Sequence, residues 1–513
     1  MIINNSNIKF KNEYLFLFLM FVISRFLYLF FFDINFDAWI LKIYWQFFPE
    51  DLLKNDLLQS LIYNHFQAPL LNLILGLLIK ITNNFHFILQ FIFLVFSLVN
   101  FIFLFKILEE LKIKKKLNLL IVTILMILPT TILYENHPYK EHIVMCFLTV
   151  IIYYSIKIIK KPSNYNYLIF TLFLILLLLV RETFHIFWAF IYLIFLNTIN
   201  KQFKKNLTSI ILIVTFVSPF YFKNLYLYKK FSISLTPYEH LSQKLEFFKE
   251  MKKNGQHEVI KKFIFKNNSD FDKYFSSKSK IFFVPLNSDP DIYVKIIKYD
   301  YKYDNQLLKS NTAFNEVYLA VDELRKEDFL KVVKNYPELL LISTSNAALR
   351  HFFRSSDTFY FTRFNADKIP GLIRLSHCIK ITLACIYELP FEKQKFQIHN
   401  QSFMKIDDRN FGYIDKIKFS LNDMNFLIIF IYCYVAISII KALINNKNKG
   451  NKLKILINFW VITFFAIFLL LILFEDGEIP RHRYPFDYLM LVFSIYYYKL
   501  NNNLFKLDDY KKN

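Results

Sequence analysis

The chain has 513 residues, a formal net charge of +22, and 55% hydrophobic residues, with 62 Phe and 33 Tyr but only 6 Gly. The mean hydropathy of +0.31 and the repeated long apolar runs exclude an ordinary soluble protein. The two closest glycines are Gly450 and Gly477, which excludes a P-loop and a GxGxxG motif, and with them a nucleotide-driven pump or an NAD enzyme. The four cysteines contain no CxxC pair and make no disulfide framework.

The apolar runs have spanning or near-spanning length, so the predicted fold class is an all-α polytopic membrane protein with 10 to 12 transmembrane helices. The first run contains Ser24 and Arg25 and is too long for the apolar region of a signal peptide, so we interpret it as a helix. The predicted spans are Tyr14–Phe32, Phe85–Phe105, Leu117–Tyr134, His142–Ile156, Tyr167–Val180, Phe184–Asn197, Leu207–Phe222, Asn425–Leu443, Ile455–Phe474 and Tyr484–Tyr498.

The loops between these runs alternate in charge. Lysine-rich loops at 112–116, 157–161 and 201–205 are predicted to be cytoplasmic by the positive-inside rule. The same rule accounts for the high net positive charge, so we predict that the protein does not bind nucleic acid. The intervening acidic and mixed loops, 33–84 and 135–141 among them, are then exoplasmic, and both termini lie inside.

Three weaker apolar segments leave the number of spans open. Residues 69–82 form a run of only 14 residues, which we interpret as an interfacial or re-entrant helix on the outer side. Residues 339–352 and 372–389 could also span the membrane.

The alternation of composition predicts three parts. Residues 1–222 form an N-terminal transmembrane module with an outer loop at 33–84, residues 223–335 an extramembrane exoplasmic region, and residues 336–513 a C-terminal transmembrane module.

The first outer loop carries the main candidate for catalysis. Asp37 follows the first helix, and a carboxylate at a membrane face can accept a proton from an attacking hydroxyl as a general base. Asp33 is the alternative, and either acid could instead be a solvated loop residue. Further along, His65 and Gln67 precede Pro69, where they could hydrogen-bond a phosphate or sugar or simply precede a helix.

The loop 134–142 brings two acids and two histidines together. Such a group could bind a divalent metal, but no HExxH motif is present, and we predict no metal ligand and no required cofactor. An acid that contacts the sugar or supports other residues of the site is the preferred role, and Glu141 is the best-placed acid and a second catalytic candidate.

Three arginines lie in predicted outer loops, against the general charge pattern. Arg181 is followed by Glu182 and could form a local ion pair or bind substrate. Arg481 and Arg483 offer the planar fork of donors that suits a phosphate, although long side chains at an interface could also snorkel.

The order of these motifs resembles the GT-C glycosyltransferases, in particular bacterial members related to protein O-mannosyltransferases and to the aminoarabinose transferase of lipid A. The resemblance covers most of the chain. Arg25 matches an arginine in the family's first helix, Asp37 its catalytic aspartate, and His65 to Leu70 its His/Lys-x-Pro-Pro-Leu element, with Gln67-Ala68-Pro69 in place of the double proline. The later matches are Pro129 and Glu141, Ser218–Asn224 with Lys223 in place of arginine, Lys334–Pro337, and Arg481–Pro485.

The resemblance implies a membrane glycosyltransferase of the bacterial inner membrane that acts on its exoplasmic face. A polyprenyl-phosphate sugar would be the donor, and a glycan, lipid or protein hydroxyl the acceptor. Asp37 would take the proton of the acceptor, Arg481 and Arg483 would stabilise the departing phosphate, and the anomeric centre would invert. Some branches of the family use a divalent metal and others do not.

Two other functions stay open. An envelope polysaccharide polymerase or ligase would depend on outer-loop arginine and histidine residues rather than on Asp37. A lipid-linked glycan flippase or transporter would need polar residues deep in several spans, whereas the predicted spans are mostly Leu, Ile and Phe. The sugar, the acceptor, the length of the lipid and the oligomeric state are not specified by the sequence.

Overall fold

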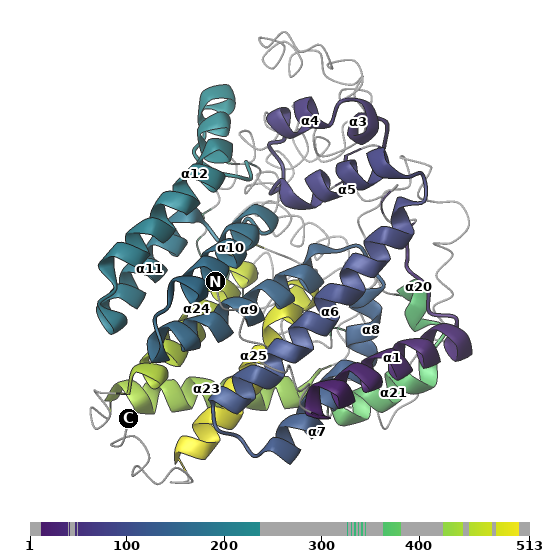
Figure 1. Ribbon diagram of the computed structural model, residues 1–513, viewed down its shortest axis with the longest axis vertical. Helices are drawn as coiled ribbons and strands as arrows, with labels where there is room; N and C mark the ends of the chain where they lie inside the picture. The colour runs from purple at the N-terminus through teal and green to yellow at the C-terminus, as the bar shows by residue number, and fades with distance from the viewer. Residues whose placement is uncertain are drawn as a thin grey trace, which may run out of the picture.

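The computed structural model describes residues 12–38, 41, 47–48, 50–235, 363–380, 424–444, 451–474 and 479–501, together with a few single residues between 326 and 356. The regular elements of these residues are α-helices, with no β-strand among them. Figure 1 shows the helices as a bundle in which most of the long helices run in similar directions.

The apolar runs that are predicted to span the membrane fall on helices, and one of them, Leu117–Tyr134, is divided between two helices at Leu128. The N-terminal helices are α1 (Asn12–Phe32), α3 (Glu50–Asn55), α4 (Leu57–Tyr63), α5 (Leu70–Ile81), α6 (Phe85–Glu110), α7 (Lys115–Ile127), α8 (Pro129–Glu135), α9 (Lys140–Lys160), α10 (Asn164–Val180), α11 (Ile186–Asn200) and α12 (Phe203–Tyr228). The later helices are α20 (Arg363–Ala366), α21 (Pro370–Ile379), α23 (Phe426–Ile444), α24 (Lys452–Phe474) and α25 (Ile479–Asn501).

Five of these helices are long and apolar enough to cross a membrane, and α7 with α8 would make a sixth as one span bent by 55°. Helices α5, α10, α11 and α23 are shorter apolar helices. The predicted α-helical, multi-pass class is therefore confirmed for the described residues, while the predicted total of 10 to 12 spans stays a prediction.

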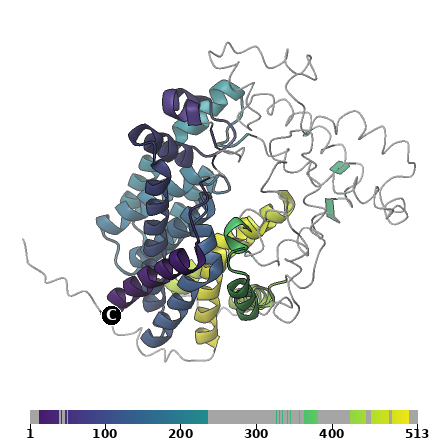
Figure 2. The same cartoon turned by 90° about the vertical axis from the view of Figure 1, so that its right-hand side faces the viewer.

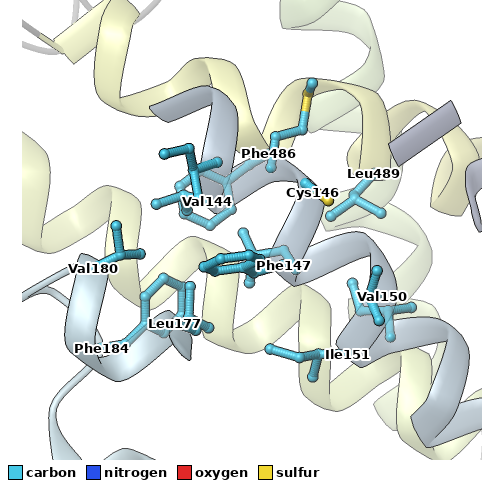
Figure 3. Packing of buried hydrophobic residues seen from close by; sticks show 14 of the residues in the cluster. Val144, Cys146, Phe147, Val150, Ile151, Leu177, Val180, Phe184, Phe486 and Leu489 are labelled. Carbon is cyan, nitrogen blue, oxygen red and sulfur yellow. The ribbon is translucent and has the colours of Figure 1, made fainter. Parts of the chain in front are cut away.

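Helix α9 forms the centre of the bundle. Its apolar residues surround the whole helix, and 83% of its spanning window is buried, as expected for a helix enclosed by others. Figure 3 shows Val144, Cys146 and Phe147 of α9 packed against Val180 of α10 and Phe486 of α25. By contrast, α1 lies on the surface of the bundle, as the view of Figure 2 shows, with 22% of its window buried.

The lysine-rich loops gather at one end of the bundle, which we call the lysine end. Lys157 and Lys160 both bind Glu110, at N–O distances of 3.1 and 2.6 Å, and Lys205 Nζ donates to the carbonyl of Pro162 at 2.6 Å. Further contacts join Lys115 to Glu13 and the Lys499 ammonium to the carbonyl of Lys112. The three loops that were predicted to share one side of the membrane therefore do share one end.

Helix α5 starts and ends at the opposite end, which we call the mixed-charge end. Just before α5, Tyr63 accepts a hydrogen bond of 2.9 Å from Tyr228 Oη in the last turn of α12. Just after α5, the chain enters α6 at Phe85, and α6 then runs to the lysine end. The geometry thus agrees with the interpretation of residues 69–82 as a segment that does not cross, and Figure 1 shows α5 lying beside α3 and α4.

Some predictions fall on residues outside the described part. They include most of the predicted extramembrane region 223–335 and of the weak span 339–352. In the weak span 372–389 the described part is α21, which ends at Ile379 with Lys380 as its C-cap. Cys378 of α21 forms a disulfide, which the sequence did not predict, whereas Cys146 and Cys433 are free thiols.

Candidate functional site

The centre of the candidate site is Glu141, in the first turn of α9. Its Oε1 atom lies 3.0 Å from Arg181 Nη1, 3.2 Å from Arg481 Nε and 3.2 Å from His482 Nδ1. All four side chains are buried. A carboxylate in the first turn also interacts favourably with the positive end of the helix dipole, so local structure and charge pairing act together here.

Three different elements bring these side chains together. Arg181 is the C-cap of α10, where the backbone turns extended, and Arg481 and His482 lie in the first turn of α25. Each of these helix ends lies at the mixed-charge end of the bundle. The sequence predicted Arg181, Arg481 and Glu141 as site residues, and the structure places these three in contact.

His482 lies between the two guanidinium groups. Its Nδ1 atom contacts Arg181 Nη2, and its Nε2 atom lies 3.2 Å from Arg481 Nη2. Guanidinium groups only donate hydrogen bonds, and a neutral imidazole has one acceptor nitrogen. With the proton on Nδ1, which also lies 3.2 Å from Glu141 Oε1, the ring donates to the carboxylate while Nε2 accepts from Arg481. His482 therefore connects the acid to the guanidinium groups.

A second ion pair extends the cluster. Lys140 Nζ lies 2.7 Å and 2.8 Å from the two carboxylate oxygens of Glu182. Burial opposes ionisation of Glu182, but the nearby Lys140 and Arg181 charges prevail and lower its pKa to about 2. In this set Lys140, Arg181 and Arg481 supply three positive charges against two carboxylates, an excess of one. Such a cluster favours an anion.

Asp37, which follows α1, contacts the first residue of the loop between α8 and α9. Its backbone N–H donates to the carbonyl of Asn136 at 2.9 Å, and its side chain is buried. The ring of the preceding Phe36 packs on Phe93 at 5.8 Å, and Phe93 stacks on His142, the neighbour of Glu141, at 6.3 Å. The loop from Asn136 to Tyr139 therefore connects the surroundings of Asp37 to the Glu141 cluster.

Asp33 has a different environment. Its carboxylate is exposed and forms an ion pair of 3.0 Å with Lys368. Hydrogen bonds from Lys368 and Asn35 lower its pKa. Because a lower pKa makes a weaker base, this environment does not favour Asp33 as a proton acceptor.

His65 and Gln67 lie in another part of the mixed-charge end. The Nδ1 atom of His65 lies 3.1 Å from the carbonyl of Tyr63, and its ring packs on Tyr228 at 5.2 Å. Gln67 exchanges hydrogen bonds with Asn64 through its backbone. These contacts join His65 to Tyr63 and to α12, and Gln67 to Asn64.

Arg483 is paired differently from Arg481. Its Nε atom lies 2.9 Å and 3.2 Å from the two oxygens of Asp487, one turn along α25, and Nη2 contacts Ser356 at 3.4 Å. Asp487 also accepts a hydrogen bond from Tyr432. Asp487 therefore balances the charge of Arg483 within α25, which makes Arg481 the stronger candidate of the two for binding an anion.

Sequence reasoning missed the partner of Arg25. Its guanidinium group binds Glu135 through Nε and Nη2, with a shortest distance of 2.5 Å, and Glu135 is fully buried. An arginine inside an apolar helix requires a partner, which is the signal that could have found it. Among the described residues no group of three or more His, Cys, Asp or Glu side chains is arranged to hold a metal. The two acids of the 134–142 loop point to different arginines.

The fold and this site define an α-helical multi-pass membrane protein with a buried cationic cluster at one end. No family model, no curated protein and no solved structure matches the chain.

Proposed function

We propose that the protein is a membrane glycosyltransferase that moves a sugar from a polyprenyl-phosphate donor to an exoplasmic hydroxyl. The observation that carries the proposal is the connection between Asp37 and the Glu141 cluster. A buried carboxylate and a cluster with an excess of positive charge lie at the two ends of one short loop. Transfer from a lipid phosphate needs both a base for the acceptor and a cation for the leaving group.

The proposed reaction is a single displacement. Asp37 accepts the proton of the acceptor hydroxyl, whose oxygen forms a bond to the anomeric carbon. The bond from that carbon to the phosphate oxygen breaks, and polyprenyl phosphate leaves with the electron pair, stabilised by Arg181 and Arg481. Attack opposite to the leaving group inverts the anomeric centre. The chemistry of the donor set does not require a metal.

Two observations support the exoplasmic side for this site. The lysine end is predicted to be cytoplasmic, and the site lies at the opposite end of the same helices. Cys378 follows the loop that pairs Lys368 with Asp33, and it forms a disulfide, as cysteines do in oxidising compartments.

The test compares two matched variants, Asp37→Asn and Asp33→Asn, in proteoliposomes. The probes are radiolabelled polyprenyl-phosphate hexoses and pentoses with an envelope extract as the source of acceptors. We expect Asp37→Asn to lose transfer by a factor of about 10² to 10⁴, the usual contribution of a general base, and Asp33→Asn to keep it. Full activity of Asp37→Asn would show that this residue is not the base.

One observation favours the second candidate, a polysaccharide polymerase or ligase. Arg181, Arg481 and His482 form the kind of arginine and histidine group on which such an enzyme would depend. If Arg481→Met abolishes the joining of glycan chains while Asp37→Asn leaves it unchanged, that candidate replaces the transferase.

A further inference from the structure

The span formed by α7 and α8 is broken at one point. Leu128 is extended, with φ −56° and ψ 137°, as residues before proline prefer, and the next residue, Pro129, has no N–H. In a continuous helix the carbonyls of residues 125, 126 and 127 would accept hydrogen bonds from the N–H groups of residues 129, 130 and 131. The 55° bend separates these groups, so three consecutive carbonyls lose their partners within a span.

Three side chains replace the lost donors in sequence order. Thr131 Oγ1 donates to the carbonyl of residue 125 at 2.7 Å. Arg25 Nη1 donates to that of residue 126 at 3.1 Å, and Tyr28 Oη to that of residue 127 at 3.1 Å. Backbone groups that are left without a partner in a bilayer are very unfavourable, so a broken span is stable only where such donors are supplied. Two of the three come from α1.

Helix α1 has limited apolar packing in its second half, where it runs beside the broken span. Its buried residues are Leu17, Phe21, Ser24 and Tyr28, a single narrow stripe, and most of its other large apolar side chains are exposed. Burying apolar surface gives no net gain where the surroundings are lipid, so packing and polar contacts decide how such a helix docks. The contacts of Arg25 and Tyr28 to the broken span, with the Arg25–Glu135 ion pair, are the polar contacts that α1 makes there.

We infer that Arg25 and Tyr28 are positioning residues, which fix α1 on the broken span and thereby hold Asp37 against Asn136. The two residues of that backbone contact lie just beyond the two elements that Arg25 and Tyr28 connect. Asp37 comes shortly after the last residue of α1, and Asn136 is the C-cap of α8. The role of Asp37 as a base rests on the proposed function, whereas the docking of α1 does not.

The test is hydrogen–deuterium exchange of the Asp37 backbone N–H in the full-length protein, because that N–H is protected by the Asn136 carbonyl. Tyr28→Phe removes one hydroxyl and keeps the ring. The matched control is Tyr14→Phe, which removes a hydroxyl that contacts Glu109 from the other end of the same helix. We expect exchange at Asp37 to become about three- to tenfold faster in Tyr28→Phe, the effect of one lost hydrogen bond, and to stay unchanged in the control.

A second variant, Arg25→Met, should accelerate exchange at Asp37 further, because it removes both the hydrogen bond to the carbonyl of residue 126 and the ion pair with Glu135. Unchanged exchange at Asp37 in folded Tyr28→Phe protein would overturn the inference, and so would equal acceleration in Tyr14→Phe. These outcomes are separate from the proposed function. If exchange accelerates in Tyr28→Phe while Asp37→Asn retains transfer activity, the positioning inference holds and the proposed base is wrong.

Discussion

Arg181 and Glu141 are 40 residues apart in the sequence, yet Nη1 and Oε1 lie 3.0 Å apart in the buried end of the bundle. Arg481 reaches the same carboxylate oxygen from α25. A single acid therefore joins the ends of three helices, and the charge that it neutralises lies in the region where the proposed donor phosphate would bind.

Removing the charge of Glu141 should be strongly destabilising. In Glu141→Gln, the two guanidinium groups stay buried without their shared carboxylate, and breaking a buried pair in this way costs about 3–5 kcal/mol. Thermal unfolding in detergent measures the loss. The matched control is Glu110→Gln at the lysine end, where partly exposed pairs with Lys157 and Lys160 contribute at most about 1 kcal/mol. Equal losses in the two variants would contradict the central role of Glu141.

The Lys140–Glu182 pair predicts a loss of stability in acid. Because the folded pKa of Glu182 is about 2 and its ordinary value is 4.5, the folded state binds this proton less tightly than the unfolded state. The contribution is complete above about pH 4.5 and is lost as the pH falls through about 2. Glu182→Gln should flatten the fall in unfolding temperature over this range. An unchanged slope in the variant would assign the acid sensitivity to other groups.

The Arg25–Glu135 pair should show strong coupling. We expect Arg25→Met and Glu135→Gln each to destabilise the protein, and the double variant to be more stable than the sum predicts by about 1–3 kcal/mol, as measured in a double-mutant cycle. Arg25→Lys should not rescue, because one ammonium group cannot reproduce the contacts of Nε and Nη2 with the same carboxylate. Simple additivity would show that the two residues act independently.

The effect of Gly76→Ala in α5 on stability should change sign with the residue at position 57. A Cβ atom there would clash with the Leu57 side chain in α4, so Gly76→Ala should destabilise the protein through overpacking by about 1–3 kcal/mol, which outweighs the roughly 1 kcal/mol that alanine gains in helix propensity. In a Leu57→Ala background the space is open, and Gly76→Ala should stabilise the protein. Unfolding midpoints of the four variants check this, and destabilisation in both backgrounds would contradict it.

The candidate site could be predicted in part. Glu141, Arg181 and Arg481 were identified because charges beside apolar runs are costly unless paired or functional, and the structure joins them. The same reasoning treated Arg481 and Arg483 alike, although Arg481 contacts Glu141 and Arg483 contacts Asp487. It also grouped His65 with the arginines as a residue that binds phosphate or substrate, whereas the structure places His65 against Tyr63 and Tyr228. Spacing along a chain does not specify which helix ends become neighbours.

The break at Pro129 is likewise only partly predictable from the sequence. The apolar run Leu117–Tyr134 is predicted as one span from its length and composition. Proline and the extended Leu128 bend it, and Arg25 and Tyr28 of another helix satisfy the freed carbonyls. The sequence contains the proline but not the identity of the donors.

The sequence by itself determined that the chain is a bundle of apolar helices and that its lysine-rich loops share one end, because the length of an apolar run and the position of its flanking charges are local properties. Only the tertiary structure decided which cation meets which acid, that Glu135 pairs with Arg25 and Glu141 with Arg181. That choice depends on how the helices rotate and pack against one another, and side chains far apart in the chain are brought within hydrogen-bond distance only when the whole bundle has formed.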